Sequence, residues 1–325
     1  MIKNKKFNIP IVFVFFNRAR ITQKNLKEIL LIKPKKIYLL SDGSDNKNEK
    51  KNIIKLRLEI EKKLKKNKIN FITIYSQNNL GSEKNVIYGL NKVFKKEKKA
   101  IIIEDDCIVD KTFYQFAKKI LNIYKNNKSI WGVTAQTFMD DYKKNYYMSK
   151  YAHCWGWATW SDRWNDFDYK MSFWKKWSKG SFWNTKNNYI DLLEQIFWKS
   201  IYKNLYANKS KSWNYKWQSF IWKKNGYFIH PHLNLVENNG FSNFSSNTKR
   251  TSKKILFRKK NKLNNFIHQK NLSFIKNDDL IIFDKIYFSI NHLISNNLLE
   301  FLKIIFKKEI LFRLLKKIKL KLFYD

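Results

Sequence analysis

The chain has 325 residues, of which 44% are hydrophobic and 17% aromatic, so it can bury a sizeable core and is not a disordered basic tail. It carries 66 Lys and Arg against 26 Asp and Glu, and this excess indicates an anionic partner: a nucleic acid, an anionic membrane surface or a phosphorylated substrate. Only 2 cysteines occur, which excludes a disulfide framework and favours a reducing compartment.

The apolar segment 9–16 is too short to span a membrane, and no cleavage-site pattern follows it. We expect it to be the first strand of a cytoplasmic protein. The many Lys, Asn and Ile residues are also typical of AT-rich coding sequence, so part of the positive charge has a compositional explanation.

Strand and helix patterns alternate up to residue 106, which predicts an α/β fold with a mostly parallel sheet covered by helices. Thr22 and Ser82 are the expected caps of the first and third helices. The expected strands are 9–16, 36–40, 70–75 and 100–103, and the expected helices are 22–31, 47–66 and 82–96.

A further amphipathic helix is expected at 113–124, and the chain is then dense in aromatic residues from 129 to 244. These aromatic residues favour either a packed core or the wall of a substrate cleft. From residue 248 onward the sequence is basic and helical in pattern, so we place a domain boundary there.

The most informative motif is Glu104-Asp105-Asp106, which directly follows the isoleucine-rich strand 100–103. Open α/β sheets bind ligands at the carboxyl ends of their strands. Three adjacent carboxylates repel one another, and a hard divalent cation would neutralise them while keeping positions open for phosphate oxygens. The alternative is a solvated acidic turn.

Three other polar turns follow expected strands, and in a parallel sheet they would share one edge with the acidic triplet. Asp42-Gly43 could accept hydrogen bonds from a base or ribose, or form an ordinary turn. Asn17-Arg18 offers a guanidinium to a pyrophosphate or a base, or to a surface ion pair. The turn Asn79-Leu80-Gly81 precedes a helix and could approach a nucleotide closely.

In this order, these motifs resemble the nucleotide-sugar-binding half of GT-A glycosyltransferases, closest to bacterial family-2-like enzymes similar to N-acetylglucosaminyltransferase I. Segment 153–160 matches a W-G-W-A-T-W run, and segments 213–218 and 234–241 match W-D-Y-Q-W and N-L-V-x-N-x-G-F. The resemblance implies a GT-A domain at 1–248, with a nucleotide-binding half at 9–106 and an acceptor half at 107–248, and a basic helical extension at 249–325.

The resemblance also implies roles for individual residues. Asp106 would coordinate Mn²⁺ or Mg²⁺ on the diphosphate, while Glu104 and Asp105 would face the ribose and the donor sugar. The run Trp155-Gly156-Trp157 would line the donor sugar and acceptor side, the alternative being core aromatics around a tight turn. The implied nucleotide is uridine, and its implied contacts are Asn17, Arg18, Asp42, Gly43, Asn79 and Gly81.

One position departs from the family pattern, because Asn214 stands where W-D-Y-Q-W has an aspartate. An amide cannot accept the proton of an acceptor hydroxyl, so another carboxylate, Glu237 or Asp168, serves as the base, or the enzyme is impaired, or transfer follows a different route. His230 and His232 could complete a metal shell or lie at the surface.

The sequence therefore predicts a metal-dependent glycosyltransferase that moves a sugar from a nucleotide-diphosphate donor to a hydroxyl of a surface glycan or lipid-linked acceptor. The alternatives are a catalytically impaired glycan-binding relative and a sugar-phosphate nucleotidyltransferase. Basic residues are spread throughout the chain and no recognised binding module occurs, so no nucleic-acid partner is expected.

A C-terminal helix is expected to hold the enzyme at the inner face of the plasma membrane. An apolar stripe would enter the headgroup boundary and cations on the opposite side would contact lipid phosphates, the alternative being that the stripe packs on the protein. The stripe is Leu311, Leu314, Leu315, Ile318 and Leu322, and the opposing cations are Arg313, Lys316 and Lys317.

Overall fold

The computed structural model describes residues 6–139, 142, 144–184, 189–240 and 258–288. These residues belong to two compact units, one made of 1–169 and 212–275 and the other of 170–211 and 276–325. The predicted boundary at 248 and the predicted membrane helix at 311–322 lie outside the described residues and stay predictions.

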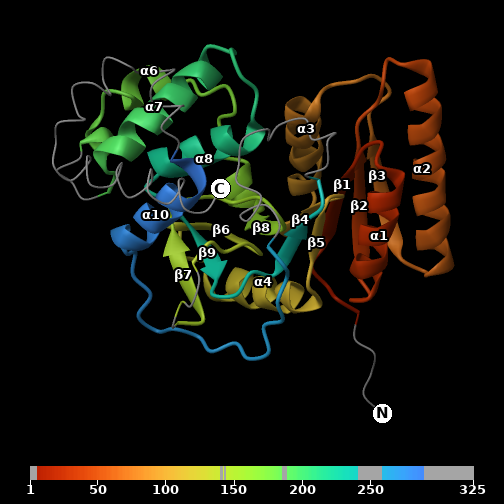
Figure 1. Cartoon of the computed structure of the whole chain (residues 1–325). Coiled ribbons are helices and arrows are strands. Elements are labelled where there is room, and N and C mark those ends of the chain that lie inside the picture. Colours follow the sequence, from red (N-terminus) through yellow and green to blue (C-terminus); the bar gives the residue numbers. More distant parts are fainter. Residues whose placement is uncertain (1–5, 140–141, 143, 185–188, 241–257, 289–325) are drawn as a thin grey trace, which may run out of the picture. The chain divides into compact units, whose positions relative to one another are not determined.

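Four parallel strands form the first half of the larger unit (Figure 1), in the order β3-β2-β1-β4. This confirms the predicted α/β class and places the three polar turns and the acidic triplet at one edge. The strands are β1 (Ile11–Phe15), β2 (Lys36–Ser41), β3 (Asn70–Tyr75) and β4 (Lys99–Glu104), and the connecting helices are α1 (Ala19–Leu30), α2 (Lys47–Lys66) and α3 (Ser82–Phe94).

Two predicted helix caps were wrong. Helix α1 starts three residues before Thr22, with Arg18 at the N-cap position, and the Thr22 hydroxyl donates a 2.9 Å hydrogen bond to the Arg18 carbonyl. Gly81, with φ +78°, rather than Ser82, occupies the N-cap position of α3. Helix α2 begins where predicted, because the Asn46 side chain accepts hydrogen bonds from the Asn48 and Glu49 amides.

The second half of the unit extends the sheet beyond β4 with β8, β6, β9 and β7, in that order. Strand β8 is antiparallel to both β4 and β6, so the complete sheet is mixed. A separate two-stranded ladder pairs β5 with β10, directly after the acidic triplet. These strands are β5 (Cys107–Val109), β6 (Ile130–Thr134), β7 (Tyr146–Ser149), β8 (Trp157–Trp160), β9 (Tyr227–Pro231) and β10 (Val236–Asn238).

A core rich in aliphatic residues, with several phenylalanines, covers one face of the sheet. Helices α1, α2 and α4 (Lys111–Ile123) bury their apolar stripes there, against alternate residues of the strands such as Phe13, Leu39 and Ile101. The predicted helix at 113–124 is α4, which starts two residues earlier because the Asp110 side chain caps it.

A layer of tryptophan and phenylalanine covers the other face, where α3 packs with α5 (Ser161–Trp164) and α8 (Trp213–Lys223). Trp157 of β8 lies at the centre of this layer and is fully buried. Much of the aromatic segment is therefore core, which was one of its two interpretations. Ring pairs with centroids 5.0–6.5 Å apart join Trp131, Trp157, Trp164, Phe167, Trp213, Trp217, Phe220 and Phe228.

The smaller unit has its own aromatic core. Helix α7 (Leu192–Tyr206) begins with a capping box in which Asp191 and Glu194 each bind the backbone amide of the other. Its Tyr202 packs on Trp174, Trp177 and Trp183 with centroid distances of 6.0–6.2 Å. The other described elements are α6 (Trp174–Trp177), η1 (Ser181–Trp183), α10 (Lys276–Ile282) and η3 (Phe283–Tyr287).

No helix among the described residues has the length and apolar character needed to cross a bilayer.

The turn after β2 lies directly against the turn after β3. A Cβ atom on Gly43 would lie 2.5 Å from the backbone carbonyl carbon and oxygen of Gln77 and 2.6 Å from the carbonyl oxygen of Asn78. Backbone atoms cannot rotate away as a side chain can, so position 43 has room only for glycine.

We expect Gly43→Ala to lower the free energy of unfolding by about 1–3 kcal/mol, because the methyl group forces the two turns apart. Chemical denaturation followed by circular dichroism measures this change. Lys47→Ala, an exposed substitution nearby on α2, serves as the control and should change stability by less than about 0.5 kcal/mol. Equal stability of the two variants would contradict the close approach.

Candidate functional site

Strand order points to the place where a ligand would bind. The chain runs from β1 to β2 on one side of β1, and after β3 it crosses to β4 on the other side. Ligands of open α/β sheets lie beyond the carboxyl ends of the strands where the connections diverge in this way. The residues after β1 and β4, Arg18 and the acidic triplet, meet at this point.

Arg18 forms ion pairs with two of the three acids. Its Nη1 donates a 2.9 Å hydrogen bond to Oδ2 of Asp106, and its Nη2 forms an ion pair with Oδ1 of Asp105. The second Asp105 oxygen accepts a 3.1 Å hydrogen bond from the Thr22 hydroxyl. The sequence analysis assigned this neutralisation to a cation alone, whereas the structure gives part of it to a guanidinium from the neighbouring strand end.

Burial makes the remaining negative charge unfavourable. It raises the pKa of Asp105 to about 6, although the charge of Arg18 acts in the opposite direction. Burial, followed by the charges of Asp106 and Asp105, raises the pKa of Glu104 to about 8. The triplet therefore carries more acid groups than the one guanidinium compensates, and a further cation would stabilise their ionised forms.

The backbone of the triplet is held in place by α1. Asn25, which is fully buried, donates hydrogen bonds of 2.9 Å from its Nδ2 to the carbonyl oxygens of Glu104 and Cys107. The carbonyl of Asp106 accepts a 2.8 Å hydrogen bond from the amide of Asn239, which follows β10. The turn that carries the acids is thus fixed from both sides.

Gly240 lies directly over the carboxylate of Asp106. A Cβ at this position would lie 2.2 Å from Oδ2 of Asp106, so the backbone approaches the acid closely only because glycine has no side chain. Glu237, the proposed alternative base, lies on β10 with its Oε1 accepting a 3.2 Å hydrogen bond from the amide of Lys260. Asn239 and Gly240 therefore border Asp106, whereas Glu237 pairs with Ile108, two residues further along the chain.

The donor chemistry around Asp106 suits a hard divalent cation that also binds a phosphate ligand. Mg²⁺ is commonly held by one or two carboxylates together with phosphate and water oxygens. A carboxylate oxygen has more than one lone pair, so the bond from Arg18 leaves Asp106 able to coordinate. Within the described ranges, no group of three His, Cys, Asp or Glu side chains forms a metal site by itself. The cofactor stays a prediction.

The second polar turn is built around Asp42, which is 6% exposed. Its Oδ1 accepts hydrogen bonds of 2.9 Å from the amides of Gly43 and Leu80, and so joins the turns after β2 and β3. Asn79 closes its own turn by accepting a 2.9 Å hydrogen bond from the Gly81 amide. Asn17, next to Arg18, donates a hydrogen bond to Glu49 of α2.

Arg57 of α2, which the sequence did not indicate, holds the backbone at the same edge of the sheet. Its Nη2 donates to the carbonyl oxygens of Asp42 at 2.7 Å and of Ser41 and Ser76 at 3.1 Å. Burial lowers the pKa of Arg57, and the guanidinium stacks over the Tyr75 ring at 4.4 Å. The only feature of the sequence that could have indicated a role for Arg57 is its place among the apolar residues of the α2 stripe.

The tryptophan run after the acidic triplet is divided between surface and core. Trp155 is half-buried, and Gly156 has a left-handed φ of +66°. Trp157 pairs with Ile102 of β4 and is fully buried, so the structure corrects its predicted place beside a ligand. Its ring stacks on Trp213 at 5.6 Å, which brings the start of α8 to the acidic edge of the sheet.

Asn214 lies in the first turn of α8, where its Oδ1 accepts a hydrogen bond from the Ser212 hydroxyl. Lys216, which follows Tyr215, forms a 2.7 Å ion pair with Glu83 in the first turn of α3. The side chains of Lys216 and Glu83 are only 7% and 16% exposed. This ion pair was not predicted, because the two residues are 133 positions apart.

The ring nitrogens of the two histidines lie next to backbone carbonyl oxygens. His230 is fully buried, which corrects its expected surface position, and its ring nitrogens lie 3.1 and 2.8 Å from the carbonyl oxygens of Gln136 and Tyr151. Burial lowers its pKa to about 4. His232 is half-buried with Nδ1 2.8 Å from the Asn145 carbonyl. Asp168, the other proposed base, is half-buried in the loop after α5.

The sequence model of the GNT-I family matches residues 1–190, more than half of the chain. The chain belongs to the GNT-I family. This membership supports an enzyme that acts on nucleotide sugars, and the matched region of this GNT-I family protein includes β1–β4, the acidic triplet and the tryptophan run. No curated protein matches the chain.

Solved structures similar to this GNT-I family protein include two nucleotidyltransferases. A cytidylyltransferase from Leptospira borgpetersenii serovar Hardjo-bovis is 12% identical, with 68% of this chain and 95% of that chain covered and a TM-score of 0.31. A UDP-glucose pyrophosphorylase without ligand is 9% identical, with 68% of this chain and 90% of that chain covered and a TM-score of 0.32.

We expect Lys216→Met to lower the free energy of unfolding by about 3–5 kcal/mol, because it leaves the largely buried Glu83 carboxylate without its cation. Chemical denaturation measures the loss. The double variant Glu83→Gln/Lys216→Met removes both charges and should recover most of it.

Lys224→Met provides the matched control, since Lys224 and its partner Asp166 are 34% and 50% exposed. This exposed pair should contribute less than about 1 kcal/mol. Equal losses of stability in the two lysine variants would show that the buried Lys216–Glu83 ion pair contributes no more than the exposed pair.

Proposed function

We propose that this GNT-I family protein is a metal-dependent glycosyltransferase that uses a UDP-sugar donor. The observation that carries the proposal is the meeting of Arg18, Glu104 and Asp106 at the carboxyl ends of β1 and β4, where a nucleotide diphosphate would lie. The sugar passes to a hydroxyl of a surface glycan or a lipid-linked acceptor. The proposal includes a cytoplasmic location at the inner face of the plasma membrane.

Each residue of the edge has a part in this reaction. Asp106 would hold Mn²⁺ or Mg²⁺, which supplies positive charge to the departing diphosphate when bound. Arg18 orients Asp105 and Asp106 by its two ion pairs. Glu104 faces the ribose and the donor sugar.

The nucleotide lies over the turns that Asp42 joins, and Trp155-Gly156 borders the donor sugar. Because Asn214 accepts a hydrogen bond but cannot take a proton, we assign the base to Glu237 of β10, which pairs with Ile108, two residues after Asp106. A sugar hydroxyl held between Glu237 and the donor could then lose its proton as the new glycosidic bond forms and the diphosphate leaves.

Two alternatives each have one feature in their favour. A sugar-phosphate nucleotidyltransferase would share the sheet, but the segment from Phe16 to Arg20, which runs from the end of β1 into α1, contains no glycine. A glycan-binding relative without activity is suggested by Asn214. Turnover of radiolabelled UDP-sugars by the full chain, with and without Mn²⁺, separates these functions, and release of pyrophosphate in place of UDP would favour the nucleotidyltransferase.

We expect Asp106→Ala to abolish Mn²⁺-dependent binding of UDP and sugar transfer, because the substitution removes the proposed metal ligand. Isothermal titration of UDP with and without Mn²⁺ measures binding. Asp105→Asn should have a milder effect, since it retains an acceptor for Thr22. Asp166→Ala, an exposed acid elsewhere, is the control. UDP affinity that is unchanged in Asp106→Ala with Mn²⁺ present would refute the assignment.

We expect Asn214→Asp to increase the transfer rate by about 10²–10⁴-fold if this position faces the acceptor, because it restores a general base. An aspartate there can keep the hydrogen bond from Ser212, and a carboxylate in the first turn of a helix is favourable. Initial rates at neutral pH measure the gain. The variant Asn214→Ala serves as the control, and an unchanged or lower rate in Asn214→Asp would place the base elsewhere.

A further inference from the structure

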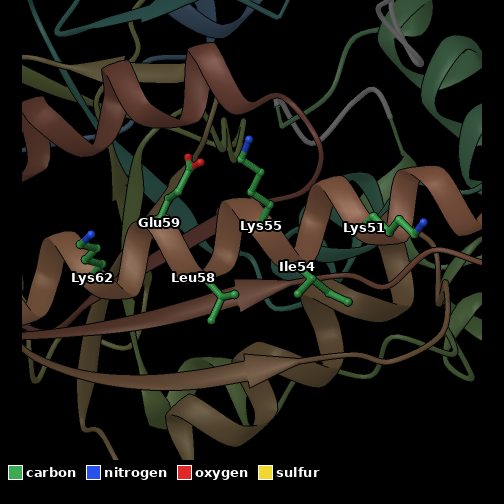
Figure 2. A pocket seen from close by; sticks show the side chains of 6 residues that line it. All are labelled: Lys51, Ile54, Lys55, Leu58, Glu59 and Lys62. Atoms are coloured by element: carbon green, nitrogen blue, oxygen red, sulfur yellow. The ribbon is translucent and has the colours of Figure 1, made fainter.

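Helix α2 has two apolar faces, of which the sheet covers only one. Its inner residues, such as Leu56 and Ile60, are at most 2% exposed, whereas Ile54 and Leu58 on the outer side are 45% and 60% exposed. Figure 2 shows the side chains of Ile54 and Leu58 pointing in the same direction from neighbouring turns of the helix. Within the described residues, the outer face therefore presents an apolar surface to solvent.

Lysines surround these two apolar side chains. A shallow hollow on the outer face of the helix is lined by residues spaced three and four apart, so that they share one face. Lys51 and Lys62 lie at its two ends in Figure 2, and the side chain of Lys55 extends on the same side of the helix as that of Glu59, opposite to Ile54 and Leu58. The residues that line it are Lys51, Ile54, Lys55, Leu58, Glu59 and Lys62.

The charge of α2 is strongly positive as a whole. The helix contains nine Lys and Arg side chains and three Glu. The single acid of the outer face, Glu59, accepts a 3.2 Å hydrogen bond from Nε2 of Gln23 on α1, and its carboxylate is directed away from Leu58 (Figure 2). An anionic partner that also receives two apolar side chains is complementary to this surface.

We propose that the outer face of α2 docks on an anionic lipid bilayer. Ile54 and Leu58 enter the boundary between headgroups and acyl chains, and the lysines at 51, 55 and 62 contact lipid phosphates. Two apolar side chains are too few for the roughly 800 Å² that each partner contributes to a stable protein interface. A nucleic acid would use the lysines and leave both apolar side chains in water.

This contact would hold the candidate site close to the membrane. Helix α2 begins at the acidic edge of the sheet, where Asn46 caps it and Glu49 binds Ser44 and Asn17. A hydroxyl acceptor carried by a lipid would then lie near the turns that join β2 to α2. The docking surface does not depend on the proposed transfer reaction, so vesicle binding tests it separately from turnover.

Co-sedimentation of the full chain with vesicles tests the proposal. We expect stronger binding to phosphatidylcholine–phosphatidylglycerol vesicles than to phosphatidylcholine alone, and weaker binding at higher salt. The variant Lys51→Glu/Lys55→Glu/Lys62→Glu should lower the partition coefficient about tenfold or more. The variant Ile54→Ser/Leu58→Ser should lower it about threefold or more, because it removes the apolar insertion.

The matched control is Lys92→Glu/Lys95→Glu/Lys96→Glu, which makes the same charge change at exposed positions near the end of α3. It should bind vesicles like the unaltered chain, and circular dichroism verifies that all variants are folded. Equal loss in the two lysine variants, or full binding by Ile54→Ser/Leu58→Ser, would overturn the proposal. Loss of binding to single-stranded RNA without loss of vesicle binding would assign the face to nucleic acid instead.

Discussion

The acidic site depends on one constraint: consecutive carboxylates at the end of a buried strand require positive charge nearby. The larger unit supplies it from the adjacent strand, since Arg18 follows β1 and reaches Asp105 and Asp106 beyond β4. Both ion pairs exist only because β1 and β4 are parallel neighbours, so their carboxyl ends meet. The order of the strands in the sheet therefore determines which charged side chains meet at the site.

The tryptophan layer gives the same edge its rigidity. Gly156, with its left-handed φ, separates the half-buried Trp155 from Trp157, the first residue of β8. Trp157 contacts α8 through Trp213. Aromatic rings bury large areas with few rotatable bonds, so they hold the helix at a defined place with little loss of side-chain entropy. The first turn of α8, which carries Asn214, is positioned in this way beside the strand that carries the acids.

The sequence was sufficient for the elements whose patterns are local. Helix α2 and strand β3 have the predicted bounds, because the apolar spacing that predicts them lies within the segments themselves. The sequence was sufficient to locate the candidate site at the strand ends, but not to show which side chains contact one another there. Nothing local indicates that Arg18 pairs with Asp105, or that Lys216 pairs with Glu83. The sequence left the burial of Trp157 open, because all four residues of β8 are buried and no alternation of apolar and polar residues marks a covered face.

The short ladder of β5 and β10 has a consequence for how the protein is made. Its Asn238 contacts Cys107, 131 residues away in sequence, whereas the pairings among β1 to β4 all lie between Ile11 and Glu104. Long-range pairings carry a larger loop-closure cost and tend to form late in folding. A nascent chain can therefore build the parallel half of the sheet early, while Asp106 gains its covering by Asn239 and Gly240 only after most of the chain has been synthesised.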